Sequence, residues 1–234
     1  EENELKIIAN EFATAAGRAV NCGFDGIEIH GANGYLLYQF TDPKQNLRSD
    51  EYGGSAVKNL KFPNMVVDAV RAAIGDDKII SYRISQDGVD DFDGYWEEGQ
   101  SYVDAISIEL NKMNVDAIHW SSFDWKDNRF DASCPPIPVS LKKHTNKSLI
   151  TNGNIFDGDT AEEVFNSDAG DFVAIGRPIF AHPDWVHIVA SGLPYNWLEF
   201  DRKYVISPPY DYSHAYPTSL PKRDWSPSVK LKRK

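Results

Sequence analysis

Short apolar runs alternate with amphipathic helical segments along the chain, and this alternation restricts the fold more than any other feature. The runs are nearly continuous in apolar or β-branched residues, and such strands are usually covered on both faces, as in parallel sheets. Repeated strand–helix units imply right-handed crossovers, in either an open doubly wound sheet or a barrel. The predicted strands are Gly26–His30, Ile79–Ile84, Val115–Trp120, Ser148–Thr151 and Asp171–Ile175.

The segments between these runs carry apolar residues at helical spacing. In the first of them, Leu5, Ile8 and Phe12 share one face, and we expect Gly23 to end the helix. Asp159 is predicted to cap the last helix, with acidic residues in its first turn. The predicted helices are Glu4–Cys22, Asn59–Ile74, Tyr95–Met113, Pro138–His144 and Asp159–Asn166.

Two glycine-bearing turns after the last two strands favour the barrel. One contains Gly153 and Asn154, the other Gly176 and Arg177, and Arg177 can bind an anion. Phosphate sites in (β/α)8 barrels are frequently built from the loops after strands 7 and 8. We therefore predict an α/β fold of the (β/α)8 TIM-barrel type, an incomplete barrel that covers about strands 4 to 8.

Such a barrel typically needs about 250 residues, and strands 1 to 3 are missing from this count. The chain also lacks an initiator Met, so we expect a fragment of a longer product. We expect residues 1–193 to form the carboxyl-terminal portion of the barrel. Residues 194–234, rich in Pro and Tyr, are predicted to be a C-terminal extension that wraps over a surface or stays loose and ends in solvated basic residues.

Composition limits the classes of partner. The 234 residues, 41% of them hydrophobic, can bury one sizeable core, while a net charge of -11 argues against nucleic acid and membrane surfaces as partners. The sequence contains neither an apolar run that could span a bilayer nor a signal-peptide start, so we expect a cytoplasmic protein. Cys22 and Cys134 are too few for a zinc or iron–sulfur site, and we expect both to be buried small hydrophobes.

The stretch from Gly26 to Leu37 places three polar groups of different chemistry directly after an apolar strand. His30 and Asn33 can each donate a hydrogen bond, and Tyr35 can give up a proton. The three residues together predict a carbonyl-binding pair beside a general acid. A lone histidine at a strand end is more often a structural residue, so the prediction depends on the three groups occurring together.

Several separated motifs follow one another in a fixed order between about Phe12 and Leu193. Together they resemble the old yellow enzyme family of FMN-dependent NAD(P)H oxidoreductases, and the order of the motifs makes the resemblance specific. The motifs are Gly26 to Leu37, Gln39-Phe40, Asn46, Arg48, Asp50 to Ser55, Tyr82 to Ser85, Asn152 to Asn154, Val173 to Pro178 and His182 to Asp184.

The resemblance implies an ene-reductase-like reaction. Hydride would come from NADH or NADPH to FMN and pass to a carbonyl-conjugated alkene, such as an enone. His30 and Asn33 match the family pair that binds the acceptor oxygen, where negative charge develops. Tyr35 matches the family proton donor, and a phenol remains protonated at neutral pH.

The resemblance also implies a set of cofactor-binding residues. Arg83 matches the arginine that faces the flavin pyrimidine, where a fixed positive charge favours the reduced flavin. Gly153 and Asn154 match one phosphate-binding loop, and Gly176 and Arg177 match the other, with Arg177 paired to the phosphate. Without the resemblance, Arg83 reads as a salt-bridged arginine and the glycines as turn residues.

Other interpretations stay open. A truncated or split barrel would have no catalysis of its own and would act as a subunit or an inactive fragment, with the missing N-terminal barrel segment as partner. A phosphate-binding barrel of the aldolase or isomerase type would share the glycine turns but leave the three polar groups unexplained. An iron–sulfur dienoyl-type reductase is disfavoured by the cysteine count.

Two further groups of residues have simple interpretations. The aromatic residues near the third predicted strand either line the substrate mouth or pack in the core: Trp120, Phe123 and Trp125. The remaining histidines are predicted to be structural or surface residues without a metal: His119, His144, His182, His187 and His214.

Overall fold

A computed structural model describes residues 1–193 and 196–201 of the chain. It has two units, Glu1–Ile175 and Gly176–Lys234, and each is described by itself. Residues 194–195 and 202–234 of the predicted extension, including the basic end, lie outside the described residues. The predicted boundary after residue 193 therefore stays a prediction.

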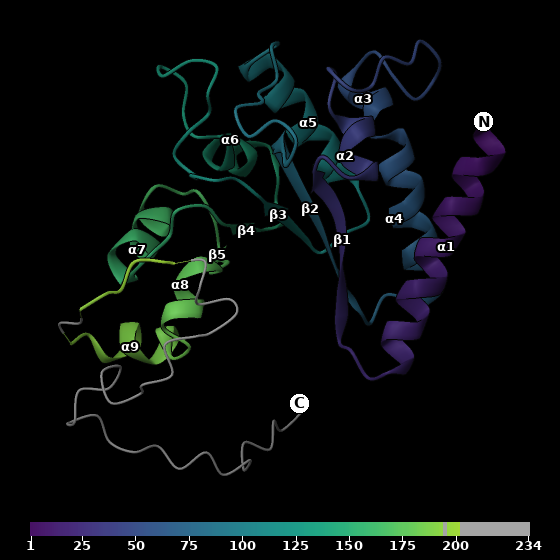
Figure 1. Ribbon diagram of the computed structural model, residues 1–234. Coiled ribbons are helices and arrows are strands. Elements are labelled where there is room, and N and C mark those ends of the chain that lie inside the picture. Colours follow the sequence, from purple (N-terminus) through teal and green to yellow (C-terminus); the bar gives the residue numbers. More distant parts are fainter. Residues whose placement is uncertain (194–195, 202–234) are drawn as a thin grey trace. The chain divides into compact units, whose positions relative to one another are not determined.

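The first unit is built on a parallel sheet of five strands that pair in chain order (Figure 1). A doubly wound sheet reverses its strand order at a switch point, whereas a barrel keeps the order of the chain. The order therefore favours the barrel type, as part of a (β/α)8 barrel. The strands are β1 (Gly26–Asn33), β2 (Ile79–Gly88), β3 (Ala117–Trp120), β4 (Ser148–Thr151) and β5 (Phe172–Val173).

All five predicted strands are present, but only β4 has the predicted ends, and β3 begins at Ala117 instead of Val115. β1 continues past His30 to Asn33, and β2 continues past Ile84 to Gly88, because the two strands keep pairing beyond the apolar runs. β5 is limited to Phe172–Val173, shorter than predicted.

The five predicted helices are also present. The last of them begins after Asp157, whose Oδ1 accepts a hydrogen bond from the Thr160 N–H at 2.9 Å, so the prediction of Asp159 as the cap is wrong. The third begins at Gln100 instead of Tyr95, since Gly99 has a φ of 59°. These helices are α1 (Glu2–Asn21), α4 (Lys61–Ile74), α5 (Gln100–Lys112), α6 (Ile137–His144) and α7 (Gly158–Asn166).

Four further helices were not predicted, because each is too short to show a helical period. Helix α2 (Leu36–Thr41) follows β1 directly, and α3 (Ala56–Asn59) precedes α4. The second unit contains α8 (Arg177–Ala181) and α9 (Trp185–Ser191). None of the helices in the described part of the chain is long and apolar enough to span a bilayer.

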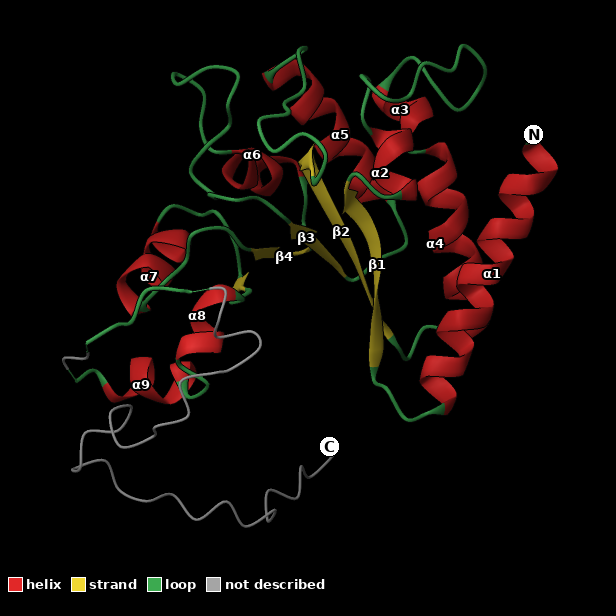
Figure 2. Cartoon of the chain, viewed as in Figure 1, coloured by secondary structure: helices red, strands yellow, loops and turns green. Residues whose placement is uncertain are grey.

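Alternate residues of the strands pack against the helices. Ile29, Ile80 and Ile118 belong to one buried cluster with side chains of α1, α4 and α5, and α1 and α4 lie side by side next to the sheet (Figure 2). The opposite face of the strands carries polar residues, because side chains alternate along a strand. That polar face positions the candidate site.

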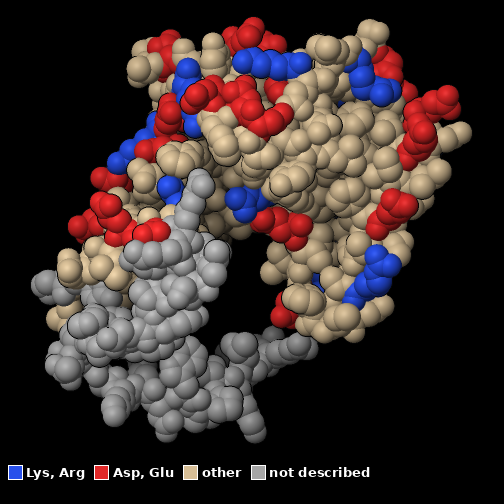
Figure 3. Space-filling model, in the orientation of Figure 1, with Lys and Arg blue, Asp and Glu red and all other residues tan. Residues whose placement is uncertain are grey.

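The cysteines do not behave as predicted. Cys22 is exposed and Cys134 is partly buried, so the expectation of two buried hydrophobes is wrong. Cys22 follows the last residue of α1, where the chain turns at the surface. On the face of the first unit seen in Figure 3, acidic and basic side chains are interspersed with uncharged surface.

Candidate active site

His30, Asn33 and Tyr35 lie in or directly after β1, toward the carboxyl end of the sheet. The rings of His30 and Tyr35 are 5.2 Å apart between centroids and tilted by 47°. Tyr35 is the residue before α2 and is 56% exposed. His30 lies within β1, not at its end as predicted. Asn33, the last residue of β1, has a φ of 60°, so the chain turns sharply between the strand and α2.

His30 is held in its neutral form by its surroundings. Burial lowers its pKa, and the positive charge of Arg83 lowers it further, while Glu28 acts in the opposite direction. A neutral imidazole has one N–H donor and one acceptor nitrogen. His30 can therefore donate a hydrogen bond to a ligand oxygen without carrying a charge.

Arg83 lies next to His30 on the polar face of the sheet, since the two residues are paired in the register of β1 and β2. Its Nη2 donates a hydrogen bond to Ser121 Oγ at 2.9 Å. Its Nη1 is 3.9 Å from Glu28 Oε1, and its buried Nε has no hydrogen-bond partner in the described part of the chain. Arg83 is thus a fixed cation with donor capacity to spare.

Glu28 and His119 complete this polar row and were not identified from the sequence as site residues. Glu28 Oε2 lies 2.9 Å from His119 Nδ1 and accepts a hydrogen bond from Ser81 Oγ at 3.0 Å. Burial alone would raise the pKa of Glu28, but His119, Ser81 and the charge of Arg83 bring it below its ordinary value. The sequence gives no signal for this row, because it depends on the pairing of Arg83 with His119 across β2 and β3.

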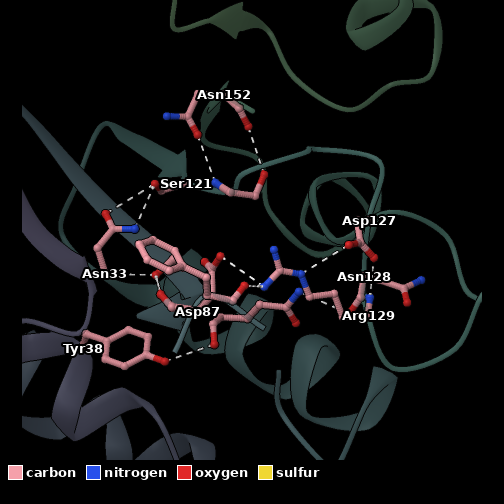
Figure 4. Close-up of polar contacts among 12 residues, drawn as sticks. Asn33, Tyr38, Asp87, Ser121, Asp127, Asn128, Arg129 and Asn152 are labelled. Atoms are coloured by element: carbon pink, nitrogen blue, oxygen red, sulfur yellow. Dashed lines mark hydrogen bonds and ion pairs between the residues drawn. The ribbon is translucent and has the colours of Figure 1, made fainter. Parts of the chain in front are cut away.

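Two serines directly after β3, Ser121 and Ser122, connect Asn33 to the Gly153 turn. Ser121 Oγ is 3.5 Å from both amide atoms of the Asn33 side chain. The N–H of Ser122 donates to Asn152 Oδ1 at 3.0 Å, and its hydroxyl donates to the Asn152 carbonyl at 3.1 Å (Figure 4). Asn33 and the Gly153 turn therefore lie at the same end of the sheet.

Gly153 is required by the packing of this turn. Its φ is 121°, and a Cβ added there would lie 2.7 Å from Ser122 Oγ and 2.8 Å from the Trp125 nitrogen. Asn154 has a φ of 51°, and its side chain donates to Asp124 Oδ2 at 3.1 Å. No described residue accepts a hydrogen bond from the backbone N–H of Gly153 or of Asn154, so both backbone N–H groups can bind an anion.

Gly176 and Arg177 belong to the second unit, where Gly176 precedes α8 and Arg177 is its first residue. A Cβ added at Gly176 would meet nothing within 4 Å. The predicted joint phosphate site of the two glycine turns stays a prediction, because the two units are described separately.

The aromatic residues after β3 divide between the two interpretations. Trp120 and Trp125 are buried, and Trp120 packs at 6.2 Å from Trp96, edge to face, in the core. Phe123 is 59% exposed, and its place at a substrate mouth stays a prediction. In the described chain, no group of three or more His, Cys, Asp or Glu residues could hold a metal ion.

Comparison with known sequences gives consistent matches. Residues 1–196 match the family described as "NADH:flavin oxidoreductase / NADH oxidase". The NADH oxidase of Thermoanaerobacter brockii is 35% identical over 191 residues, which are 78% of this chain and 29% of that protein. The 12-oxophytodienoate reductase 2 of Arabidopsis thaliana is 33% identical over 219 residues, 92% of this chain and 56% of the relative. The chain thus spans about half the length of such relatives, or less.

Solved structures have the same fold. Morphinone reductase in complex with tetrahydroNAD superposes with a TM-score of 0.72 and 27% identity, over 87% of this chain and 53% of that one. An old yellow enzyme homologue from Zymomonas mobilis gives a TM-score of 0.71 over 89% of this chain and 60% of that one, and its 22% identity bears on the fold alone.

Proposed function

The chain belongs to the NADH:flavin oxidoreductase / NADH oxidase family, and from this premise we propose that it acts as an FMN-dependent oxidoreductase that passes hydride from NADH or NADPH to a carbonyl-conjugated alkene. The observation that carries the proposal is the grouping of His30, Asn33 and Tyr35 beside Arg83 at one end of the sheet. The names of two relatives, an oxophytodienoate reductase and a morphinone reductase, support an unsaturated carbonyl compound as substrate.

The donors of this chain fit FMN. Arg83 has a buried Nε without a partner among the described residues, and a guanidinium fixed by Ser121 suits the acceptor atoms of a flavin pyrimidine. The amides of Gly153 and Asn154 suit a phosphate, and Gly176 and Arg177 are proposed to supply the rest of that site. When bound, FMN supplies the hydride transfer itself.

His30, Asn33 and Tyr35 are proposed to supply the remaining chemistry. Neutral His30 and the Asn33 amide donate hydrogen bonds to the substrate carbonyl oxygen and stabilise the negative charge that develops there. The exposed hydroxyl of Tyr35 gives its proton to the substrate carbon next to the carbonyl group. A donor pair and a proton source are the groups that reduction of a polarised alkene needs from a protein.

One experiment tests the proposal directly. The purified chain is mixed with FMN, freed of excess, and examined for a bound-flavin absorption spectrum and for NADPH-dependent reduction of cyclohexenone. Arg83→Ala should weaken FMN binding, whereas Lys112→Ala, a change at an exposed lysine on α5, should not. A folded chain that does not bind FMN would contradict the proposal.

A second candidate function is a barrel part without catalysis of its own. It is favoured by the open edge of β1, which pairs with β2 alone in the described part of the chain, and by the exposure of Glu28 and His30 on that strand. An N-terminal barrel segment is then the proposed partner. The discriminating measurement is FMN binding with and without a polypeptide that corresponds to the amino-terminal half of the relatives.

A further inference from the structure

The pairing of β1 with β2 is interrupted directly beside Asn33. Gly31 pairs with Ile84 and Asn33 pairs with Gly88, so β1 has one residue between these pairs and β2 has the three residues 85–87. The extra residues of β2 form a bulge, and bulges often redirect side chains next to active sites. We call residues 85–87 the β2 bulge.

Ser85, the first residue of the β2 bulge, makes two short hydrogen bonds. Its Oγ accepts from the Asn33 N–H at 2.8 Å, and its hydroxyl donates to the Asp87 carbonyl at 2.7 Å (Figure 4). The directions are fixed, because an N–H only donates and a carbonyl only accepts. Ser85 is fully buried, so no water competes for these bonds.

The bond to Ser85 acts on a residue in a costly conformation. Asn33 has a φ of 60°, in the left-handed region that costs most residues with a Cβ roughly 1–2 kcal/mol and asparagine less. Such a conformation persists when its surroundings impose it. On the other side of Asn33, its carbonyl accepts from the Val89 N–H at 3.2 Å, so the two flanking peptides are held by Ser85 of β2 and by the residue directly after β2.

The β2 bulge is itself anchored on two sides. Tyr38 of α2 donates its hydroxyl to the Gln86 carbonyl at 3.1 Å, and Arg129 Nη1 lies 3.4 Å from Asp87 Oδ2 (Figure 4). Among the residues that the structure describes, the Asn33 side chain has only long hydrogen-bond contacts of 3.5 Å, to Ser121. The direction of the carboxamide is therefore set mainly by the backbone that Ser85 holds.

We propose that Ser85 is a positioning residue, which holds the Asn33 backbone in its left-handed conformation and thereby points the carboxamide at the carbonyl oxygen of the substrate. The role of the carboxamide rests on the proposed function, whereas the control of the Asn33 backbone does not. Ser85 itself touches neither substrate nor cofactor in this proposal.

The first test needs no cofactor. Amide hydrogen exchange of Asn33 is measured by NMR in the wild-type chain, in Ser85→Ala and in Ser85→Thr, which keeps the hydroxyl. Loss of one hydrogen bond should speed the exchange roughly three- to tenfold in Ser85→Ala, and threonine should restore the protection. The control is Ser107→Ala, another fully buried serine, whose hydroxyl bonds within α5. Unchanged exchange at Asn33 in Ser85→Ala would overturn the proposal.

A chain with Ser85→Ala that does not fold is compared with the double variant Asn33→Gly/Ser85→Ala. Glycine takes the left-handed conformation freely, so the double variant should fold if the hydroxyl serves to impose that conformation. Failure of glycine to restore folding would count against the proposal.

The second test uses the FMN-loaded chain. Ser85→Ala should raise KM for cyclohexenone roughly three- to tenfold, because the Asn33 carboxamide that binds the substrate oxygen is displaced. The rate of NADPH oxidation with a saturating acceptor that takes electrons directly from the flavin should stay unchanged, because this acceptor does not depend on that carboxamide. Equal loss in both reactions would indicate a merely structural role and would overturn the proposal. Faster exchange at Asn33 in a chain that binds no FMN would contradict the proposed function and leave the control of Asn33 by Ser85 standing.

Discussion

Two arginines at opposite ends of the same sheet are used in different ways. At the amino ends of the strands, the guanidinium of Arg71 forms hydrogen bonds within the protein: it donates to Asp116 Oδ2 at 2.7 Å and to the Lys78 carbonyl at 2.6 Å. Asp116 Oδ2 also accepts from the Ile80 N–H at 2.8 Å. At the carboxyl ends, Arg83 keeps a buried Nε without a partner in the described chain.

The backbone shows this contrast less sharply. Asn33 and Asn154, which have positive φ, lie next to the carboxyl ends of β1 and β4, whereas Asp168, with a φ of 52°, precedes β5. Strained backbone and unused donors lower stability unless something else compensates for them. The difference teaches that one end of this sheet holds the strands together, while the other is arranged for a ligand, as is general in (β/α)8 barrels.

The largest expected effect is at the ligand-binding end. Tyr35→Phe should slow the reduction of cyclohexenone by about 10²- to 10⁴-fold, the range of a general acid. Because Tyr35 is 56% exposed, the free energy of unfolding should hardly change. Stopped-flow measurement of the two half-reactions checks this prediction. A parallel loss in the oxidation of NADPH would show that the phenol is not the proton source.

The next effect is at the stabilising end. Arg71→Ala removes a side chain that is 7% exposed and leaves a carboxylate and backbone carbonyls without their donor. The free energy of unfolding should fall by about 3 kcal/mol, measured with urea. Lys142→Ala is the matched control: it removes a cation that is 19% exposed from its pair with Asp171 and should cost about 1 kcal/mol or less. Weaker FMN binding by folded Arg71→Ala molecules would break the division between the two ends.

Gly153 tests the division between the two ends of the sheet, because it stabilises the fold although it lies at the ligand-binding end. Gly153→Ala forces a Cβ against Ser122 and Trp125, whereas Gly54→Ala, at a φ of 94°, meets nothing within 4 Å. Both variants bear the strain of a positive φ, so their difference isolates the collision. Gly153→Ala should be less stable than Gly54→Ala by about 2 kcal/mol in urea unfolding. Equal stabilities would mean that the turn relaxes freely.

The sequence predicts the presence of the strands well because their apolar runs are continuous. It predicts their ends poorly, because these depend on contacts between strands in the folded sheet. Gly31 and Asn33 look like turn residues, yet both belong to β1. Gly31 is needed there because a Cβ would collide with the Tyr82 hydroxyl of the neighbouring strand. Close approach between strands is a property of the folded sheet, and no local pattern indicates it.

The candidate site divides in the same way. His30, Asn33 and Tyr35 stand within one short motif, so their grouping could be predicted from the sequence. Ser85 and His119 could not, because their contacts depend on the register of β2 with β1 and β3. The β2 bulge in particular is visible only when Gly31 and Asn33 are paired with their partners across the sheet.

The smallest expected effect concerns the charge of His30. Its pKa is lowered in the folded chain by burial and by Arg83, so the unfolded chain binds a proton more readily below its ordinary pKa of about 6.5. Wild-type stability should therefore fall relative to His30→Gln as the pH drops from 7 toward 5, and the two curves should run parallel above pH 7. Urea unfolding across this range measures the difference, and His182, whose pKa burial also lowers, is present in both chains and cancels. A difference that does not vary with pH would mean that Glu28 offsets burial and Arg83 together, so that the pKa of His30 is the same in the folded and the unfolded chain.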